Sequence, residues 1–312
     1  IHNNYRMSNY FDNKPVSMEP QVNQYSSHMV MTNVSQESKT KIVNIDTKFC
    51  DDYNYDTACT LADYTISLPE AINKVCSMTV ENIELPLTYY NVSSALGNNV
   101  FKVTQLSTPP VLTIITVPDG EYTLSSLEIR IGSLLGSDIS ITLTANNTTM
   151  NNSSGSDDYS IEFAVNKDGS FDKHNFKSKL GWMLGFTELS YTIPRNTGEI
   201  VAERISNLTR PRVLYLQVDD FAQTKQNSFS TMMSRSRNSD NIIAKIMVDR
   251  SSNDFRKIFF ANKANGYLLS DKREYSGKTN IKRLQVQLVD EFDQKINLNG
   301  LDFSFSLKIE HL

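Results

Sequence analysis

The chain has 312 residues, with 31 basic and 35 acidic side chains and a net charge of −4. This balance gives no electrostatic reason to expect direct binding of duplex nucleic acid, which needs a concentrated basic surface. No apolar stretch is long enough to span a membrane, and the first residues do not resemble a signal peptide. Three cysteines without metal-ligand spacing argue against a disulfide framework, with a loop closed by Cys50 and Cys59 as the alternative.

The first 40 residues differ from the rest in composition. They are rich in Asn, Ser, Gln and Met and show no helical or strand periodicity. Such a segment cannot bury enough apolar surface to offset the entropy that ordering costs. We therefore predict an extended N-terminal arm over residues 1–40, ordered either against a neighbouring molecule or against the surface of its own chain.

From Lys41 onwards, short runs rich in β-branched and aromatic residues alternate with Pro, Gly and Asn turns, which predicts strands. The clearest run is residues 301–309, where Leu, Phe and Ile alternate with Asp, Ser and Lys as in a half-buried antiparallel strand. Pro69 and Pro86 are expected to end two of the strands. In chain order the predicted strands cover residues 42–45, 64–68, 75–85, 111–117, 139–143, 159–165, 213–218, 242–248, 281–289 and 303–309.

Two helices are predicted among these strands. Apolar residues recur at helical spacing over residues 124–135, where Ser125 and Glu128 resemble a capping box. A second helix is predicted over residues 175–184. It contains Trp182, the only tryptophan, for which packing in the core is favoured over a role as an exposed anchor for a partner.

Two polar segments, residues 146–158 and 223–240, are predicted as loops. Methionines exposed beside arginines are typical of protein interfaces, so four residues of the second loop are candidate contacts with a partner. The alternative is an ordinary solvated loop. The candidate contacts are Met232, Met233, Arg235 and Arg237.

No catalytic or metal-binding motif is present in the sequence. The four histidines lack metal-ligand spacing, and there is no nucleophile elbow, phosphate loop or dinucleotide-binding glycine cluster. Four pairs of adjacent carboxylates are most simply interpreted as solvated loops or strand ends. We therefore predict no enzymatic activity, no cofactor and no metal, with a glycosidase-like carboxylate pair formed in space as the alternative. The pairs are residues 51–52, 157–158, 219–220 and 290–291.

Many strands without alternating helices predict a mainly β protein, a sandwich or a barrel. Several segments in a fixed order also resemble a family of virion proteins of nucleocytoplasmic large DNA viruses, over residues 42–310 as a whole. Lys48 and Cys50 depart from the family's pattern in the first of them. The segments are residues 45–53 (IDTKFCDDY), 66–78 (ISLPEAINKVCSM), 83–90 (IELPLTYY), 97–99 (GNN), 118–123 (PDGEYT), 180–186 (LGWMLGF), 288–292 (LVDEF) and 298–305 (LNGLDFSF).

The resemblance implies a fold as well as a function. The expected fold is mainly β: an antiparallel single jelly-roll sandwich over residues 41–312, with inserted short helices, a smaller β insertion at about 119–200, and the arm over residues 1–40. The expected function is that of a structural capsid protein of a large icosahedral DNA virus, most simply the penton protein, a homopentamer at the five-fold vertices.

The same resemblance implies partners and a location. The partners would be copies of the chain itself, the major capsid protein and other minor capsid proteins, in the capsid of a virion assembled in the host cytoplasm. Two alternatives stay open. One is a minor capsid protein that bridges major capsid capsomers under the shell, and the other is a glycan- or receptor-binding β-sandwich module.

Overall fold

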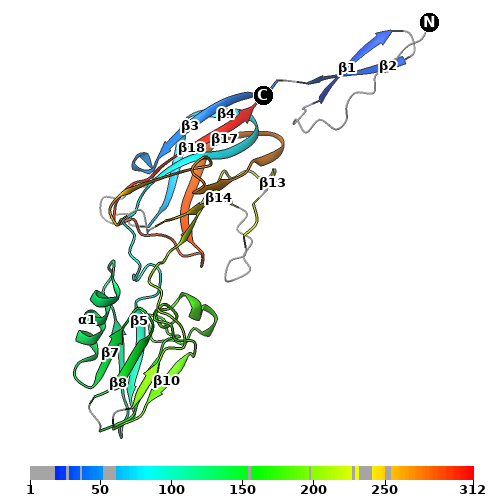
Figure 1. The fold of residues 1–312 in the computed structure, drawn as a ribbon. Coiled ribbons are helices and arrows are strands. Elements are labelled where there is room, and N and C mark those ends of the chain that lie inside the picture. The colour runs from blue at the N-terminus through cyan, green and yellow to red at the C-terminus, as the bar shows by residue number, and fades with distance from the viewer. Residues whose placement is uncertain are drawn as a thin grey trace.

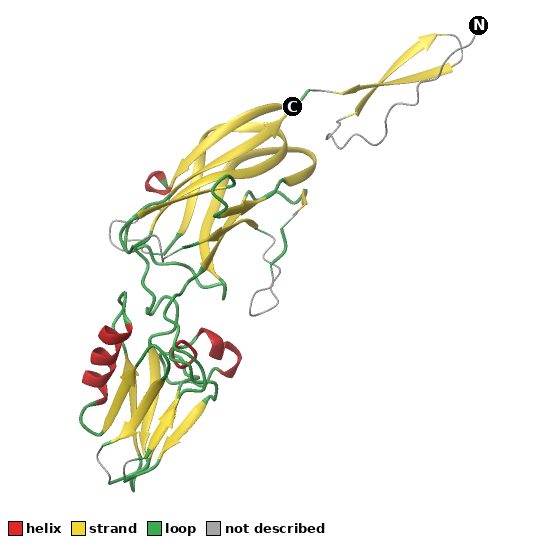
Figure 2. Cartoon of the chain, viewed as in Figure 1, coloured by secondary structure: helices red, strands yellow, loops and turns green. Residues whose placement is uncertain are grey.

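The fold is known from a computed structural model, which is mainly β, with antiparallel strands and few helices, as the sequence predicts (Figure 2). For the first two of its ranges it describes the backbone alone. The structure describes residues 18–25, 28–35, 37–51, 61–153, 156–196, 198–226, 229–231, 241–249 and 254–312.

Residues on both sides of a long insertion form the body of the chain. Its strands are β3 (Lys39–Asp46), β4 (Asp63–Pro86), β12 (Val213–Asp219), β13 (Lys225–Gln226), β14 (Ile242–Met247), β15 (Ile258–Asn262), β16 (Leu268–Ser270), β17 (Arg273–Asp290) and β18 (Ser304–His311). A short 3-10 helix, Thr47–Phe49, follows β3.

The pairing of these strands defines the fold. Strand β4 serves two sheets, because residues 63–78 pair with β17 while residues 75–86 pair with β18 and β15. One layer therefore has the order β3–β18–β4–β15 and the other the order β4–β17–β12–β14–β16, with β13 beside β17. When β4 is counted as two strands and the short strands β13 and β16 are left out, the layers read 1-8-3-6 and 2-7-4-5 in chain order. This is the arrangement of a single jelly roll.

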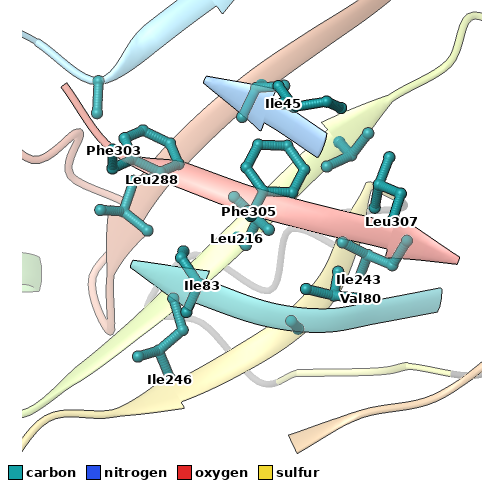
Figure 3. Packing of buried hydrophobic residues seen from close by; sticks show 14 of the residues in the cluster. Ile45, Val80, Ile83, Leu216, Ile243, Ile246, Leu288, Phe303, Phe305 and Leu307 are labelled. Atoms are coloured by element: carbon teal, nitrogen blue, oxygen red, sulfur yellow. The ribbon is translucent and has the colours of Figure 1, made fainter. Parts of the chain in front are cut away.

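The jelly-roll core lies between the two layers. In β18, Phe305, Leu307 and Ile309 are buried while Ser306 and Lys308 are half-exposed, as the alternation in the sequence predicts. Figure 3 shows Phe305 and Leu307 among side chains that β4, β12 and β14 contribute to the same cluster. Each fully buried Leu or Phe contributes roughly 1.5–3 kcal/mol relative to an exposed one, so this shared core holds the two layers together.

The segment between β4 and β12 buries a second core of its own, which draws on residues from Val92 to Ala202. It forms a separate lobe in Figure 1, with sheets of order β10–β9–β5–β6 and β11–β8–β7. The predicted insertion at about 119–200 falls inside this segment, and the division of the chain into domains stays a proposal. The elements are β5 (Val100–Gln105), β6 (Val111–Thr116), α1 (Leu124–Leu135), β7 (Ile139–Leu143), β8 (Thr148–Asn152), β9 (Tyr159–Glu162), η2 (Lys173–Ser178), α2 (Leu180–Met183), β10 (Ser190–Ile193) and β11 (Glu199–Val201).

A β-hairpin lies within the predicted N-terminal arm. Strands β1 (Met18–Tyr25) and β2 (His28–Ser35) pair with each other as a two-stranded sheet of their own. Figure 1 shows the hairpin projecting away from the jelly roll. An isolated two-stranded hairpin is marginally stable in water, so this one is expected to need a partner surface.

Strand β4 does not end at Pro69 as predicted, because it runs on to Pro86. The pairing explains why the proline is tolerated. Between the pairs Ser67–Arg283 and Ile72–Ile281 the register shifts, so the residues around Pro69 bulge out of the ladder. A bulged residue donates no ladder hydrogen bond, and the missing N–H of proline therefore costs little there.

Three other local predictions were wrong in part. Helix α1 has its predicted bounds, but its capping box joins Thr123 to Ser126 and not Ser125 to Glu128. The second predicted helix is split into η2 and the single turn α2. Strand β8 lies inside the predicted loop 146–158, where its Thr and Asn residues gave no apolar alternation.

Candidate binding site between the two lobes

The predicted partner contacts lie outside the described residues, so their role stays a prediction; they are Met232, Met233, Arg235 and Arg237. One described residue earlier in the same loop, Phe229, packs against Tyr215, Ile242 and Val289. Tyr215 alternates with core residues of β12, so this small cluster lies on the face of the layer that points away from the jelly-roll core.

A basic pocket lies where the inserted lobe joins the jelly roll. Its cavity volume is about 220 Å³, and its walls carry four basic side chains and one carboxylate. The walls come from the η2–α2 region, from the segment that leads into β12, and from the turn after β17. The lining residues are Lys177, Trp182, Met183, Arg204, Ile205, Asn207, Thr209, Arg210, Arg212, Glu291 and Phe292.

Trp182 forms the aromatic part of the pocket wall. The guanidinium carbon of Arg204 lies 4.1 Å from the centroid of the tryptophan ring, and the Nζ atom of Lys177 lies 5.4 Å from it. Phe176 meets the same ring edge-on, with centroids 5.9 Å apart. The tryptophan is half-buried. It packs on one core residue, as expected, and also holds two cations at the pocket by cation–π attraction.

Two glycines allow this arrangement to form. A Cβ atom on Gly181 would lie 2.3 Å from the Phe163 ring, so only glycine lets α2 approach that closely. Gly185 has φ +97°, and a Cβ there would lie 2.1 Å from the carbonyl oxygen of Arg204. The Arg204 N–H donates to the Gly185 carbonyl at 3.0 Å. The backbone of Arg204 is thus fixed directly against the turn that follows Trp182.

Arg210 connects the inserted lobe to the jelly roll. Its Nη2 atom lies 3.9 Å from Oδ2 of Asp290 and its Nε atom 3.7 Å from Oε1 of Glu291. Its guanidinium also lies over the Phe292 ring, 4.3 Å from the centroid, and donates to the Lys177 carbonyl at 3.1 Å. Burial lowers the pKa of Arg210, against the attraction of the two carboxylates.

Asp290 is buried, so the interpretation of residues 290–291 as a solvated strand end was wrong for this residue. Its Oδ1 atom accepts hydrogen bonds from the N–H groups of Phe292 and Gln294, both at 2.8 Å. Burial raises the pKa of Asp290 to about 6, although these hydrogen bonds and Arg210 favour the ionised form. This carboxyl therefore titrates near neutral pH at the join between the lobes.

Asp220 is also buried, so the interpretation of residues 219–220 as solvated was wrong for this residue. Its side chain is 0% exposed, and its Oδ2 atom lies 3.2 Å from Nη1 of Arg273, whose side chain is 2% exposed. Arg273 also donates to the carbonyls of Val218 and Asn241, and the Tyr275 hydroxyl donates to Asp220. Burial and the Asp220 charge raise the pKa of Tyr275, which keeps the phenol protonated. The cluster ties the end of β12 to the start of β17.

The described residues contain no group of three His, Cys, Asp or Glu side chains that could hold a metal ion. No helix in the described ranges has the length and apolar character needed to cross a bilayer. The chemistry that the pocket offers is the binding of an anion, by cations fixed beside an aromatic ring.

No protein-family model matches the chain, and no curated protein matches it significantly. Among solved structures, the chain is similar to the mavirus penton protein, with 11% identity over 88% of this chain and 100% of that chain and a TM-score of 0.40. It is also similar to a chain of the Sputnik virophage, with 13% identity over 88% of this chain and 98% of that chain and a TM-score of 0.39. The jelly-roll fold of this chain is defined by the strand order of its two layers.

Proposed function

We propose that this protein is a structural component of a viral capsid, and specifically the penton protein at the five-fold vertices of a large icosahedral DNA virus. The observation that carries the proposal is the strand order 1-8-3-6 and 2-7-4-5. This order is that of a single jelly roll, and it is formed by strands from the part of the chain in which a fixed series of motifs resembles virion proteins. In this role the protein is not an enzyme, and its location is the virion.

The surface offers several places at which copies could pack. Edge strand β6 exposes Val111 and Leu112 by 51% and 56%, and edge strand β15 exposes Ile258 by 73%. Unpaired edges with apolar side chains are templates for pairing with another chain. In a closed ring each copy presents one surface to a different surface of its neighbour, and separate edges at the two lobes suit such a contact.

The projecting β1–β2 hairpin favours a second candidate within the same class. A hairpin that pairs with no other described strand can reach a neighbouring molecule, as a minor capsid protein that bridges major capsid capsomers would need to do. The partners in either role are other shell proteins, with copies of the chain itself added in the penton.

Quantitative mass spectrometry of gradient-purified particles tests the capsid role. The expected result is a constant ratio of this chain to the major capsid protein across the particle peak, unchanged by a detergent wash that removes adsorbed proteins. A ratio that varies across the peak, or loss of the chain in the wash, would overturn the proposal.

A further inference from the structure

We propose that the pocket between the lobes binds an acidic peptide segment of another protein, through carboxylate side chains held by Arg204, Lys177 and Arg212. The inference concerns the ligand of one site. Binding of this ligand does not depend on the position of the protein in a capsid.

Three of the four cations that line the pocket lack a carboxylate partner among the described residues. Lys177, Arg204 and Arg212 are exposed, and none of them lies within ion-pairing distance of a carboxylate in the described part of the chain. The fourth cation, Arg210, is already engaged by Asp290 and Glu291. Three cations that line one hollow repel each other, and a bound anion relieves that repulsion.

Arg204 is held in place before any ligand binds. The Arg204 side chain lies on Trp182, and its backbone is hydrogen-bonded to Gly185. A guanidinium fixed on an aromatic ring keeps its N–H donors for a planar acceptor, and a carboxylate accepts two of them at once. The entropy that a free arginine loses on binding is thereby reduced.

The lining of the pocket favours a peptide over other anions. Nucleic-acid binding depends on contacts with many phosphates, whereas this pocket offers three cations besides the Arg210 that Glu291 engages. The Trp182 ring is already contacted by two cations, so it is not a free platform for stacking a sugar. The Asn207 Oδ1 atom already accepts from the Thr209 N–H at 2.9 Å, which leaves the Asn207 amide N–H groups and the Thr209 hydroxyl for a peptide backbone. The cavity of about 220 Å³ accommodates one or two side chains.

The test uses the full chain and its only tryptophan, which lies in the pocket. The probe is a hexapeptide of alternating Asp and Gly, blocked at both ends so that only side-chain carboxylates are charged. The control peptide has Asn in place of each Asp. We expect a saturable change in Trp182 emission with the acidic peptide alone. Its affinity should fall about tenfold between low and physiological salt, because exposed charges are screened.

Substitutions then locate the binding, measured by calorimetry because they also alter the tryptophan environment. Arg204→Gln and Lys177→Gln should each weaken binding of the acidic peptide about tenfold, which is the loss of one charge-assisted contact. The matched control is Lys263→Gln, an exposed lysine in the turn after β15. A thermal melt of each variant establishes that it is folded. Arg204→Lys keeps the charge but loses the planar fork, so it should fall between wild type and Arg204→Gln.

Three results would overturn the proposal. The first is an equal response to the acidic and the Asn peptides. The second is unchanged affinity in folded Arg204→Gln and Lys177→Gln. The third is saturable binding of inorganic phosphate, a sialylated trisaccharide or a DNA oligonucleotide without binding of the acidic peptide. Because this experiment uses the isolated chain and the capsid test uses particles, failure of one is distinguishable from failure of the other.

Discussion

The guanidinium of Arg210, in the segment that leaves the inserted lobe, lies 3.9 Å from the buried carboxylate of Asp290 at the end of β17. Burial nevertheless raises the pKa of Asp290 to about 6. The folded protein therefore holds a proton on this group between about pH 4 and pH 6, where the unfolded chain has released it. The contribution of Asp290 to stability is full below about pH 4 and is lost as the pH rises through about 6.

Replacement of Asp290 by Asn should remove this dependence. Between pH 4.5 and pH 7.5 the wild type loses the part of this contribution that lies above pH 4.5, about 1.5 pH units or roughly 2 kcal/mol. The variant should therefore gain about that amount of stability at pH 7.5 relative to pH 4.5, compared with wild type. Urea unfolding at the two pH values measures it. Asp254→Asn, which removes an exposed carboxylate, is the control. An Asp290→Asn protein whose stability depends on pH as in wild type would contradict the raised pKa of Asp290.

Gly185→Ala should destabilise the protein by roughly 2 kcal/mol or more, because the left-handed φ and the contact with the Arg204 carbonyl both exclude a Cβ atom. It should also shift Trp182 emission, since Arg204 must move. The matched control is Gly132→Ala inside α1, where a Cβ meets nothing within 4 Å and helix propensity predicts a gain of up to about 1 kcal/mol. Equal effects of the two substitutions on the free energy of unfolding would refute this account of Gly185.

Leu307→Ala should cost roughly 2–5 kcal/mol, because Leu307 is fully buried between the two layers of the jelly roll. Leu269→Ala makes the same chemical change on β16, where the leucine is 52% exposed, and should cost no more than about 0.5 kcal/mol. Chemical denaturation of the two variants measures the difference. Similar costs would mean that the layers do not share the core described.

Asp220→Asn should cost roughly 3–5 kcal/mol, because it leaves the buried guanidinium of Arg273 without its counter-charge. The adjacent Asp219 is 27% exposed and pairs with Lys225, so Asp219→Asn should cost no more than about 1 kcal/mol. Thermal unfolding of the two variants at neutral pH compares them. A smaller loss for Asp220→Asn than for Asp219→Asn would be inconsistent with a buried ion pair at β17.

Features set by local pattern could be predicted from the sequence. The alternation in residues 301–309 predicted β18, and apolar spacing predicted the bounds of α1. Strand β8 could not be predicted, because Thr and Asn give no apolar alternation. The jelly-roll order itself depends on pairs such as Phe305 with Ile45, far apart in the chain, and came only from the resemblance to virion proteins.

The contacts of the binding pocket also join residues that are far apart in the chain, and the sequence did not predict them. Asp220 and Asp290 looked solvated because the arginines that pair with them, Arg273 and Arg210, lie more than 50 residues away. The pocket had one signal in the sequence, the cluster of Arg204, Arg210 and Arg212 within a short segment. That signal does not predict that Trp182 lies beside it, because the fold brings the two segments together.

A density map of the purified particles, in which this chain is placed, tests the penton role. We expect the jelly roll to fit density at the five-fold vertices, as a ring of five copies related by rotation. Density for the chain along facet edges under the shell would contradict the penton assignment, and its absence from the whole shell would contradict a capsid role altogether.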